Sequence, residues 1–347
     1  MASKLRSLGG ALVALMVALP AGGQEVHRLS GTDVAVYNLA GATHVVRGTG
    51  SDVVVRVTRG GSDAARLEVE AGLVGGRQTL RVRYPDDLII YPEMGRGSRT
   101  NVRVRDDGRF WGEDRGGSTV EIRGSGRGLE AWADLVVEVP AGKDVGVHVA
   151  VGAMEARGVQ SDLTLHVGSG SVDAADITGG LDVDTGSGSA TVSGIHGDVS
   201  VDTGSGSVTV REVDGDDVSI DTGSGMVRGG GLRARSVSVD TGSGSVELDG
   251  VSASEVSVDT GSGSVDLVLL RDVDALDVDT GSGSVTIYAP EDLGGMVDLD
   301  TGSGGIEMDF AVQVRSVRRD ELRGTLGDGR GTIRIETGSG GIRLLKR

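Results

Sequence analysis

Seven aspartates recur along the chain, each opening the pentapeptide Asp-Thr-Gly-Ser-Gly. They are Asp184, Asp202, Asp221, Asp240, Asp259, Asp279 and Asp300, and Glu336 opens a variant, ETGSGG. Asp-Thr-Gly-Ser usually introduces the catalytic carboxylate of an aspartic protease, in which two such carboxylates face each other and share a proton. Seven copies at one spacing predict a column with no facing pair and no cleft. We therefore interpret the motif as structural: the aspartate accepts backbone N–H groups in an Asx-type turn at the corner, and the threonine and serine hydroxyls can do likewise. We expect no catalytic residue.

Calcium binding is the alternative chemistry for the same seven aspartates. Nonapeptide repeats in secreted β-rolls bind calcium, although here the aspartate precedes the glycines. Residues 161–310 hold 28 Asp and Glu against 5 Lys and Arg, a net charge of −23. Carboxylates stacked in register repel one another, and a hard divalent cation would relieve that repulsion. A calcium column therefore stays open beside a solvated acidic face screened by salt, and no other cofactor is expected.

Two further signals are weak. Gly-Ser-Gly-Ser resembles a phosphate-binding loop, but a dinucleotide site requires a helix after the glycines, and the pattern that follows is that of a strand. His148 and His166 lie 18 residues apart on the same period as the aspartates. We interpret both as surface histidines, because two isolated histidines do not make a metal site.

The elements that carry the aspartates repeat every 18 to 21 residues. Around the motif, as in VSVDTGSGSVTV at 199–210, apolar and polar residues alternate, which is the pattern of a strand with one buried face. A fixed period of this length indicates stacked units. The sequence therefore predicts an all-β fold, a parallel β-solenoid of the right-handed β-helix type, with rungs of about 18–21 residues.

The N-terminus has the pattern of a targeting segment. Lys4 and Arg6 precede the apolar run Leu8–Leu19, and small residues follow it. This pattern predicts a signal peptide at residues 1–23, hence export to the periplasm, the cell surface or the medium. An uncleaved anchor is the alternative. No second long apolar run follows, so we expect no transmembrane span in the mature chain.

The remainder divides into two regions by its patterning. Residues 24–143 are predicted to form irregular N-terminal rungs that cap the rod, and residues 144–347 the regular solenoid. Within the first region, 92–128 is an insertion with eight arginines, flexible or hairpin-like. Arginine and tryptophan are favoured at binding hot spots. The candidate partner-binding residues are therefore Arg103, Arg105, Arg109, Phe110 and Trp111.

Four segments resemble a bacterial family of adhesin-like proteins with repeated β-strands, a domain of unknown function. They are DVAVYNLAGATHVV near the start, DLVVEVPAGKDVGVHVAVGAMEARGV at 134–159, the VDTGSGSV ladder and GRGTIRIETGSGGIRL at the end. The resemblance covers nearly the whole mature chain except the arginine-rich insertion. It implies an exported, right-handed β-helix-like protein and supplies no catalytic residue.

The favoured function is a non-enzymatic scaffold that engages a surface, a glycan or an envelope protein. Nucleic acid is not expected, since the chain is predicted to be exported and its net charge is −17. A polysaccharide-active β-helix enzyme is the less favoured alternative, because residues 133–283 contain no Phe, Tyr or Trp to stack on a sugar. We also expect the last rung, near Arg347, to leave an open edge that could pair with another copy.

Overall fold

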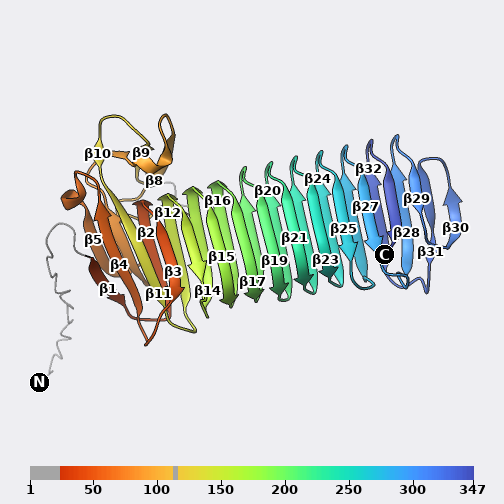
Figure 1. Ribbon diagram of the computed structural model, residues 1–347, viewed down its shortest axis with the longest axis horizontal. Coiled ribbons are helices and arrows are strands. Elements are labelled where there is room, and N and C mark those ends of the chain that lie inside the picture. The colour runs from red at the N-terminus through yellow and green to blue at the C-terminus, as the bar shows by residue number, and fades with distance from the viewer. Residues whose placement is uncertain (1–23, 112–115) are drawn as a thin grey trace, which may run out of the picture.

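The computed structural model describes residues 24–111 and 116–347. The predicted signal peptide at 1–23 lies outside the described residues. Two long sheets run the length of a rod, and a smaller sheet stands at its N-terminal end (Figure 1). The fold is therefore an all-β parallel solenoid, as the period and the alternation predicted.

One long sheet has 15 strands. In spatial order they are β30 (Val312–Val317), β31 (Glu321–Leu326), β28 (Gly295–Thr301), β32 (Thr332–Thr337), β26 (Ala275–Thr280), β24 (Glu255–Thr260), β22 (Ser236–Thr241), β20 (Asp217–Thr222), β18 (Val199–Thr203), β16 (Leu181–Ser187), β14 (Asp162–Ser169), β12 (Asp144–Val151), β2 (Asp33–Ala40), β6 (Arg77–Arg83) and β5 (Glu68–Val74). Its strands are parallel except in the pairs β28–β31, β31–β30 and β6–β5.

The second long sheet has 14 strands. In spatial order they are β1 (Glu25–Leu29), β4 (Val53–Gly60), β11 (Trp132–Val139), β3 (Thr43–Arg47), β13 (Met154–Arg157), β15 (Val172–Thr178), β17 (Ala190–His196), β19 (Val208–Asp214), β21 (Val227–Arg233), β23 (Val246–Ser252), β25 (Val265–Leu269), β27 (Val285–Ala289), β33 (Ile342–Lys346) and β29 (Ile306–Met308). Strands from both long sheets contribute to one continuous apolar core.

Each regular rung consists of two strands, one in each long sheet. In the rung of β18 and β19, Val199, Val201, Val208 and Val210 are buried, whereas Asp202 is exposed. Parallel pairing places each of these residues over the equivalent residue of the next rung, for example Val201 over Ile220. The alternation seen in the sequence thus becomes a narrow core of β-branched side chains between the two sheets.

Glycine is required where the two strands of a rung meet. A Cβ atom on Gly206 would lie 1.6 Å from the carbonyl oxygen of Gly188 in the preceding rung. The equivalent atom on Gly225 would lie 1.7 Å from the oxygen of Gly206. The second glycine of Asp-Thr-Gly-Ser-Gly therefore lets neighbouring corners approach more closely than any side chain allows.

The rungs do not follow chain order at the C-terminal end. β32 lies between β26 and β28, and β33 lies between β27 and β29. The last rung of the chain is thus inserted into the stack. The expectation that the rung near Arg347 leaves an open edge is wrong, because β30 and β29 occupy the ends of the two sheets instead.

At the N-terminal end, β2 stacks directly on β12 although 103 residues separate the two strands. The intervening chain forms β3, β4 and β11 of the 14-stranded sheet, the hairpin β5–β6 and a third, smaller sheet. This small sheet has the order β10 (Leu129–Glu130), β7 (Leu88–Ile90), β9 (Ser118–Arg123) and β8 (Arg99–Val104). Two short 3₁₀ turns, Ala64–Arg66 and Pro92–Met94, complete the region.

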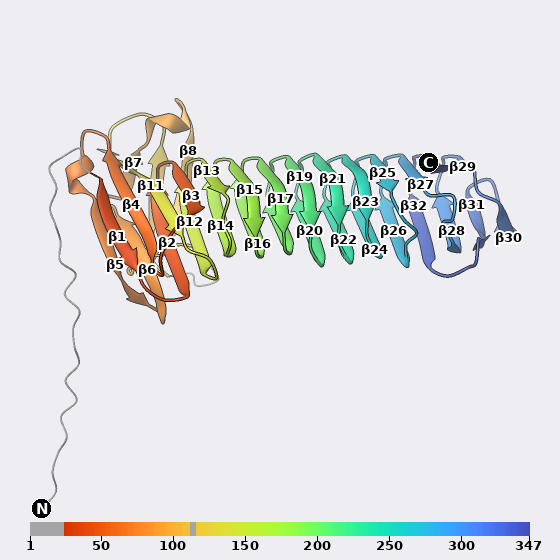
Figure 2. The ribbon, with the colours of Figure 1, turned by 60° about the horizontal axis from the view of Figure 1, so that its bottom comes forward.

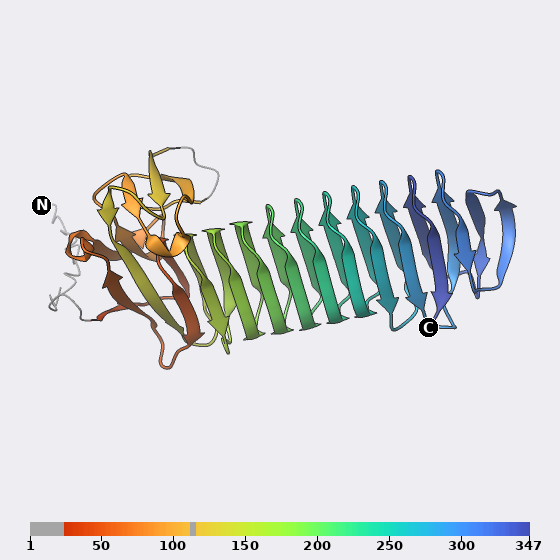
Figure 3. The ribbon, with the colours of Figure 1, turned by 45° about the horizontal axis from the view of Figure 1, so that its top comes forward.

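Two of the four strands of the small sheet, β8 and β9, belong to the arginine-rich insertion at 92–128. They form an antiparallel hairpin. The small sheet stands over the N-terminal rungs (Figure 3). A second apolar cluster joins it to the outward face of the 15-stranded sheet, with Tyr37 and Leu39 on one side and Ile89, Phe110 and Ile122 on the other. The first regular strands of the 15-stranded sheet, β2 and β12, are consequently buried on both faces. The domain boundaries at 23/24 and 143/144 stay a prediction.

Candidate functional site

One outward column of the 15-stranded sheet consists of carboxylates, which we call the acidic column. Its members, in spatial order, are Asp184, Asp202, Asp221, Asp240, Asp259, Asp279, Glu336 and Asp300. These side chains lie on one face of one sheet, and neighbouring strands are about 4.8 Å apart. Sequence spacing predicted the column, but not the place of Glu336 between Asp279 and Asp300.

Burial and neighbouring negative charges together raise the pKa of two members of the column. Partial burial, followed by the charges of Asp184 and Asp221, raises the pKa of Asp202 above its ordinary value. Partial burial, followed by the charges of Asp259 and Glu336, raises the pKa of Asp279. At Asp202 and Asp279, neighbouring carboxylates therefore make ionisation less favourable, as expected for like charges on adjacent strands.

The corner of each regular rung is fixed by threonine rather than by aspartate. Thr222 is completely buried, its hydroxyl donates to the oxygen of Gly206 at 3.1 Å, and it accepts from the N–H of Gly225 at 3.1 Å. Equivalent pairs of bonds occur at Thr203, Thr241, Thr260, Thr280, Thr301 and Thr337. Of the predicted acceptors, threonine rather than aspartate makes the corner, and its hydroxyl also joins consecutive rungs.

Metal ligation was the alternative for the column. Within residues 24–111 and 116–347, no group of three or more His, Asp or Glu side chains is arranged to hold a metal ion. Calcium binding along the column stays a prediction.

Toward the N-terminus, the equivalent positions of the next three strands are occupied by the aromatic side chains of His166, His148 and Tyr37, which we call the ring ladder. His166 lies under Asp184, His148 under His166 and Tyr37 under His148 in successive strands. The rings of Tyr37 and His148 are stacked, with centroids 4.4 Å apart, and those of His148 and His166 meet edge to face at 4.9 Å. Figure 1 places the three strands β2, β12 and β14 beside the small sheet.

His148 is not a surface residue, contrary to the sequence-based interpretation. Its side chain is buried, and among the described residues neither ring nitrogen has a hydrogen-bond partner. Burial, followed by the charges of His166 and Arg77, lowers the pKa of His148 to about 3. The imidazole is therefore neutral at ordinary pH and packs as an aromatic side chain.

The insertion covers this ladder with two consecutive aromatic residues. The Phe110 ring packs edge to face against Tyr37 at a centroid distance of 5.6 Å. The Trp111 ring lies 5.3 Å from that of His166, and its Nε1 donates to Oδ2 of Asp184 at 3.0 Å. The insertion therefore contacts the first carboxylate of the acidic column, a contact for which the sequence carried no signal.

The five candidate partner-binding residues have different environments. Phe110 is 1% exposed, Arg105 donates to the carbonyl oxygen of Trp111 at 2.7 Å, and Arg109 pairs with Asp107 at 2.9 Å. Arg103 is exposed on the edge strand β8. The structure thus packs Phe110 and Trp111 against the rod, whereas Arg103 is exposed on the outer strand of the small sheet.

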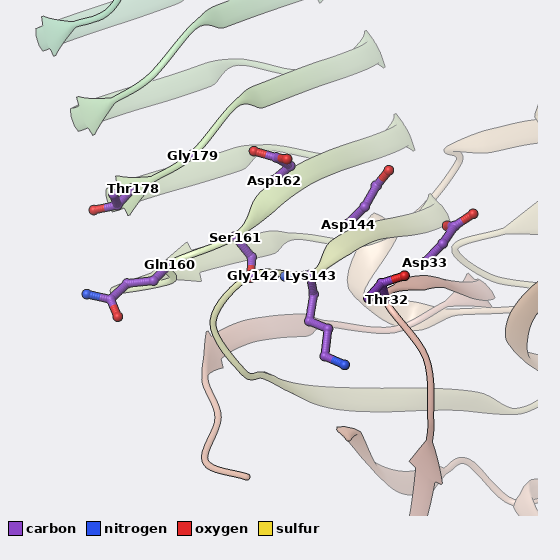
Figure 4. A pocket seen from close by; sticks show the side chains of 10 residues that line it. All are labelled: Thr32, Asp33, Gly142, Lys143, Asp144, Gln160, Ser161, Asp162, Thr178 and Gly179. Atoms are coloured by element: carbon purple, nitrogen blue, oxygen red, sulfur yellow. Dashed lines mark hydrogen bonds between the residues drawn. The ribbon is translucent and has the colours of Figure 1, made fainter. Parts of the chain in front are cut away.

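A shallow groove of about 420 Å³ lies where the first three rungs begin. Asp33, Asp144 and Asp162 line it from successive strands, and the Lys143 side chain extends away from them (Figure 4). Arg77 pairs with Asp33 and Asp144, and Asp162 accepts from the N–H of Gly180 at 2.8 Å. These carboxylates are therefore already engaged within the protein.

The described part of the chain includes no helix with the length and apolar character that a membrane crossing requires. A family model described as Toastrack DUF4097 matches residues 131–345. No curated protein matches the chain.

Three crystal structures are similar to the chain. One, "a putative cell adhesion protein" from Clostridium sporogenes ATCC 15579, has 11% identity over 94% of this chain and 100% of its own, with a TM-score of 0.25. A second, "putative lipid binding protein" from Parabacteroides distasonis ATCC 8503, has 11% identity over 94% and 97%, with a TM-score of 0.42. A third, "a putative adhesin" from Bacteroides fragilis NCTC 9343, has 12% identity over 92% and 95%, with a TM-score of 0.38.

Proposed function

The chain belongs to the Toastrack DUF4097 family, and from that premise we propose that it is an exported, non-enzymatic scaffold that engages an anionic partner of the cell envelope. Most of the described chain forms a rod. The outward residues of this rod are mostly small, polar or acidic. Export rests on the predicted signal peptide at 1–23, and the periplasm or the cell surface is the expected place.

The small sheet supplies the contact surface. Arg96, Arg99 and Arg127 are exposed on or beside its edge strand β8 and the neighbouring loops, and Arg103 is exposed on the same strand. The second apolar cluster holds the sheet rigidly on the rod. Guanidinium groups displayed on a rigid edge suit the phosphate or carboxylate groups of an envelope glycan or lipid. This display is the observation that carries the proposal.

The geometry of the acidic column opposes a catalytic role. Its carboxylates point outward from a single sheet in register, so no two of them enclose a substrate between them. Glycosidases place two carboxylates on opposite sides of the scissile bond. A polysaccharide-active enzyme therefore remains the less favoured reading of the fold.

Binding to an anionic polymer tests the proposal. The wild-type protein should sediment with purified cell-wall polymer carrying phosphate or carboxylate groups, and added salt should release it. The double substitution Arg96→Ala and Arg99→Ala should lower binding about tenfold, roughly 1.4 kcal/mol. The matched control is Arg211→Ala with Arg233→Ala, two exposed arginines of the rod.

Two results would contradict the proposal. One is equal binding by both double variants, and the other is recovery of the protein from the cytoplasm of producing cells. Hydrolysis of an acidic glycan that is abolished by Asp221→Asn and Asp240→Asn would favour the enzyme instead.

A further inference from the structure

The two ends of the 15-stranded sheet are unpaired edges at opposite ends of the rod. β5 forms one edge and β30 forms the other. Both lie at the extremes of the molecule in two views (Figures 1 and 2). Within the described residues, each strand pairs on one side only, β5 with β6 and β30 with β31. Each edge therefore presents a row of backbone N–H and C=O groups to a potential partner strand.

Apolar side chains on the core side of the sheet remain exposed at both edges. Val314 and Val317 are 52% and 64% exposed, and Val317 is paired with Leu322 on that side. At the other end, Leu73 is 69% exposed, and Ala71 beside it is paired with the buried Leu80. These side chains are uncovered because the core ends there. Two rods placed end to end would continue one core into the next.

The strand directions suit such an arrangement. β30 is antiparallel to β31, which is antiparallel to β28, so β30 runs in the direction of the regular rungs. β5 is antiparallel to β6, which is parallel to β2, so β5 runs in the opposite direction. Translation of a second copy along the rod therefore brings β30 and β5 together as an antiparallel pair, which is the more stable kind.

The charges agree with this antiparallel arrangement. Glu68 and Glu70 lie in the first half of β5. Arg315 lies in the second half of β30, and Arg318 and Arg319 follow that strand directly. An antiparallel pair places the start of one strand beside the end of the other, so the acidic half of β5 meets the basic end of β30. Complementary charges of this kind select partner and register.

We propose that the protein assembles head to tail, with β30 of one copy pairing with β5 of the next to continue the 15-stranded sheet. Because the two surfaces differ, the contact is heterologous and leaves a free edge at each end of every assembly. The register shift between Val314 and Ser316 shortens the regular part of β30. A local irregularity of this kind limits edge pairing, so we expect assembly to be weak and to depend on concentration.

Sedimentation velocity of the purified full chain, supported by negative-stain electron microscopy, tests the proposal. The average mass should rise at least twofold between about 1 µM and about 1 mM protein. Electron micrographs should contain rods whose lengths are multiples of one molecule. High salt should reduce the assembly, since it screens the contact between arginine and glutamate.

Two double variants block one edge each. Val314→Lys with Val317→Lys blocks β30, and Leu73→Lys with Ala71→Lys blocks β5, because lysine on an edge strand opposes pairing. All four side chains are exposed, so the fold should survive. The control is Leu270→Lys with Tyr288→Lys, two side chains that are 43% and 37% exposed and distant from both edges.

Mixing the blocked proteins distinguishes this arrangement from others. Each blocked variant alone should remain monomeric, whereas their equimolar mixture should form dimers and nothing larger, since only one pair of complementary edges remains. The control variant should assemble as the wild type does. The proposal is overturned by a wild type that stays monomeric at about 1 mM, by assembly that either blocked variant retains alone, or by loss of assembly in the control. None of these outcomes depends on whether the small sheet binds an envelope polymer.

Discussion

The indole Nε1 of Trp111 donates a hydrogen bond to Oδ2 of Asp184 across 73 residues of sequence, at a distance of 3.0 Å. This bond joins the arginine-rich insertion to the first carboxylate of the acidic column. Phe110 and Trp111 pack over the ring ladder of Tyr37, His148 and His166, and this bond holds Trp111 in that position. The bond thereby helps to fasten the small sheet to the rod.

Loss of this bond should loosen the insertion without unfolding the rod. Trp111→Phe keeps an aromatic ring and removes the N–H, so we expect a loss of about 1 kcal/mol and faster proteolysis within 92–128. Asp184→Ala removes the acceptor and should have a similar effect, and the double variant should cost less than the sum of the two. Asp221→Ala, at a position of the same column that no tryptophan contacts among the described residues, is the control. Strict additivity of the two single variants would show that the bond contributes nothing.

The buried threonine hydroxyls should contribute more to stability than the exposed aspartates beside them. Thr222→Val preserves shape but leaves the oxygen of Gly206 and the N–H of Gly225 without that partner. We expect a loss of about 1–3 kcal/mol, measured by urea denaturation. Thr222→Ser should retain most of the stability, and Thr191→Val, at an exposed position, should be nearly neutral. A neutral Thr222→Val would contradict the assignment of the corner to threonine.

Substitution by alanine should destabilise the protein at the corner residue Gly225 and should be tolerated at Gly230. In Gly225→Ala the new Cβ would lie 1.7 Å from the oxygen of Gly206, so the rungs must separate locally. We expect a loss of about 2–4 kcal/mol and a lower melting temperature. Gly230→Ala is the matched control, because its Cβ would meet the nearest atom at 3.7 Å. Similar melting temperatures for the two variants would mean that the corners have more room than the structure indicates.

Acidification should destabilise the protein through His148. Its folded pKa of about 3 lies below the ordinary value of 6.5, so the unfolded chain binds a proton first and stability falls as the pH drops below about 6.5. The expected loss from this group between pH 7 and pH 5 is about 2 kcal/mol. Tyr37, His166 and Arg77 surround the ring. His148→Phe should therefore flatten the pH dependence of the melting temperature, and His196→Phe, at an exposed position, should not.

Asp202 and Asp279 change the stability of the protein with pH in the opposite direction to His148. Their folded pKa values are raised, so their contribution to stability is present at low pH and is lost as the pH rises through those values. A melting temperature that rises steadily from pH 7 to pH 5 in the wild type would contradict the assignment of the acid response to His148.

Salt should stabilise the acidic column by screening. Sodium chloride should raise the melting temperature, and Asp221→Asn with Asp240→Asn should reduce that response, since adjacent carboxylates repel. Calcium at millimolar concentration is compared with sodium chloride at equal ionic strength. A larger rise with calcium that the two substitutions abolish would favour calcium binding along the column. Equal rises in melting temperature with calcium and with sodium chloride would favour a solvated acidic face that is screened by salt.

The sequence by itself determined the rung. A period of about 19 residues, with alternation on both sides of Asp-Thr-Gly-Ser-Gly, fixes which side chains point inward and places the seven aspartates in one column. Both features are local and repeated, so every copy carries the same information. The exact corner chemistry was already ambiguous, because aspartate, threonine and serine can all accept from a nearby N–H.

Only the tertiary structure decided the order of the rungs and the place of the insertion. Because neighbouring rungs are nearly identical, a stack in chain order and a stack with β32 inserted between β26 and β28 satisfy the same pattern. The contacts of Phe110 with Tyr37 and of Trp111 with Asp184 occur once and join distant segments. No repeat encodes such contacts, since they depend on how non-repeating side chains fill a particular space.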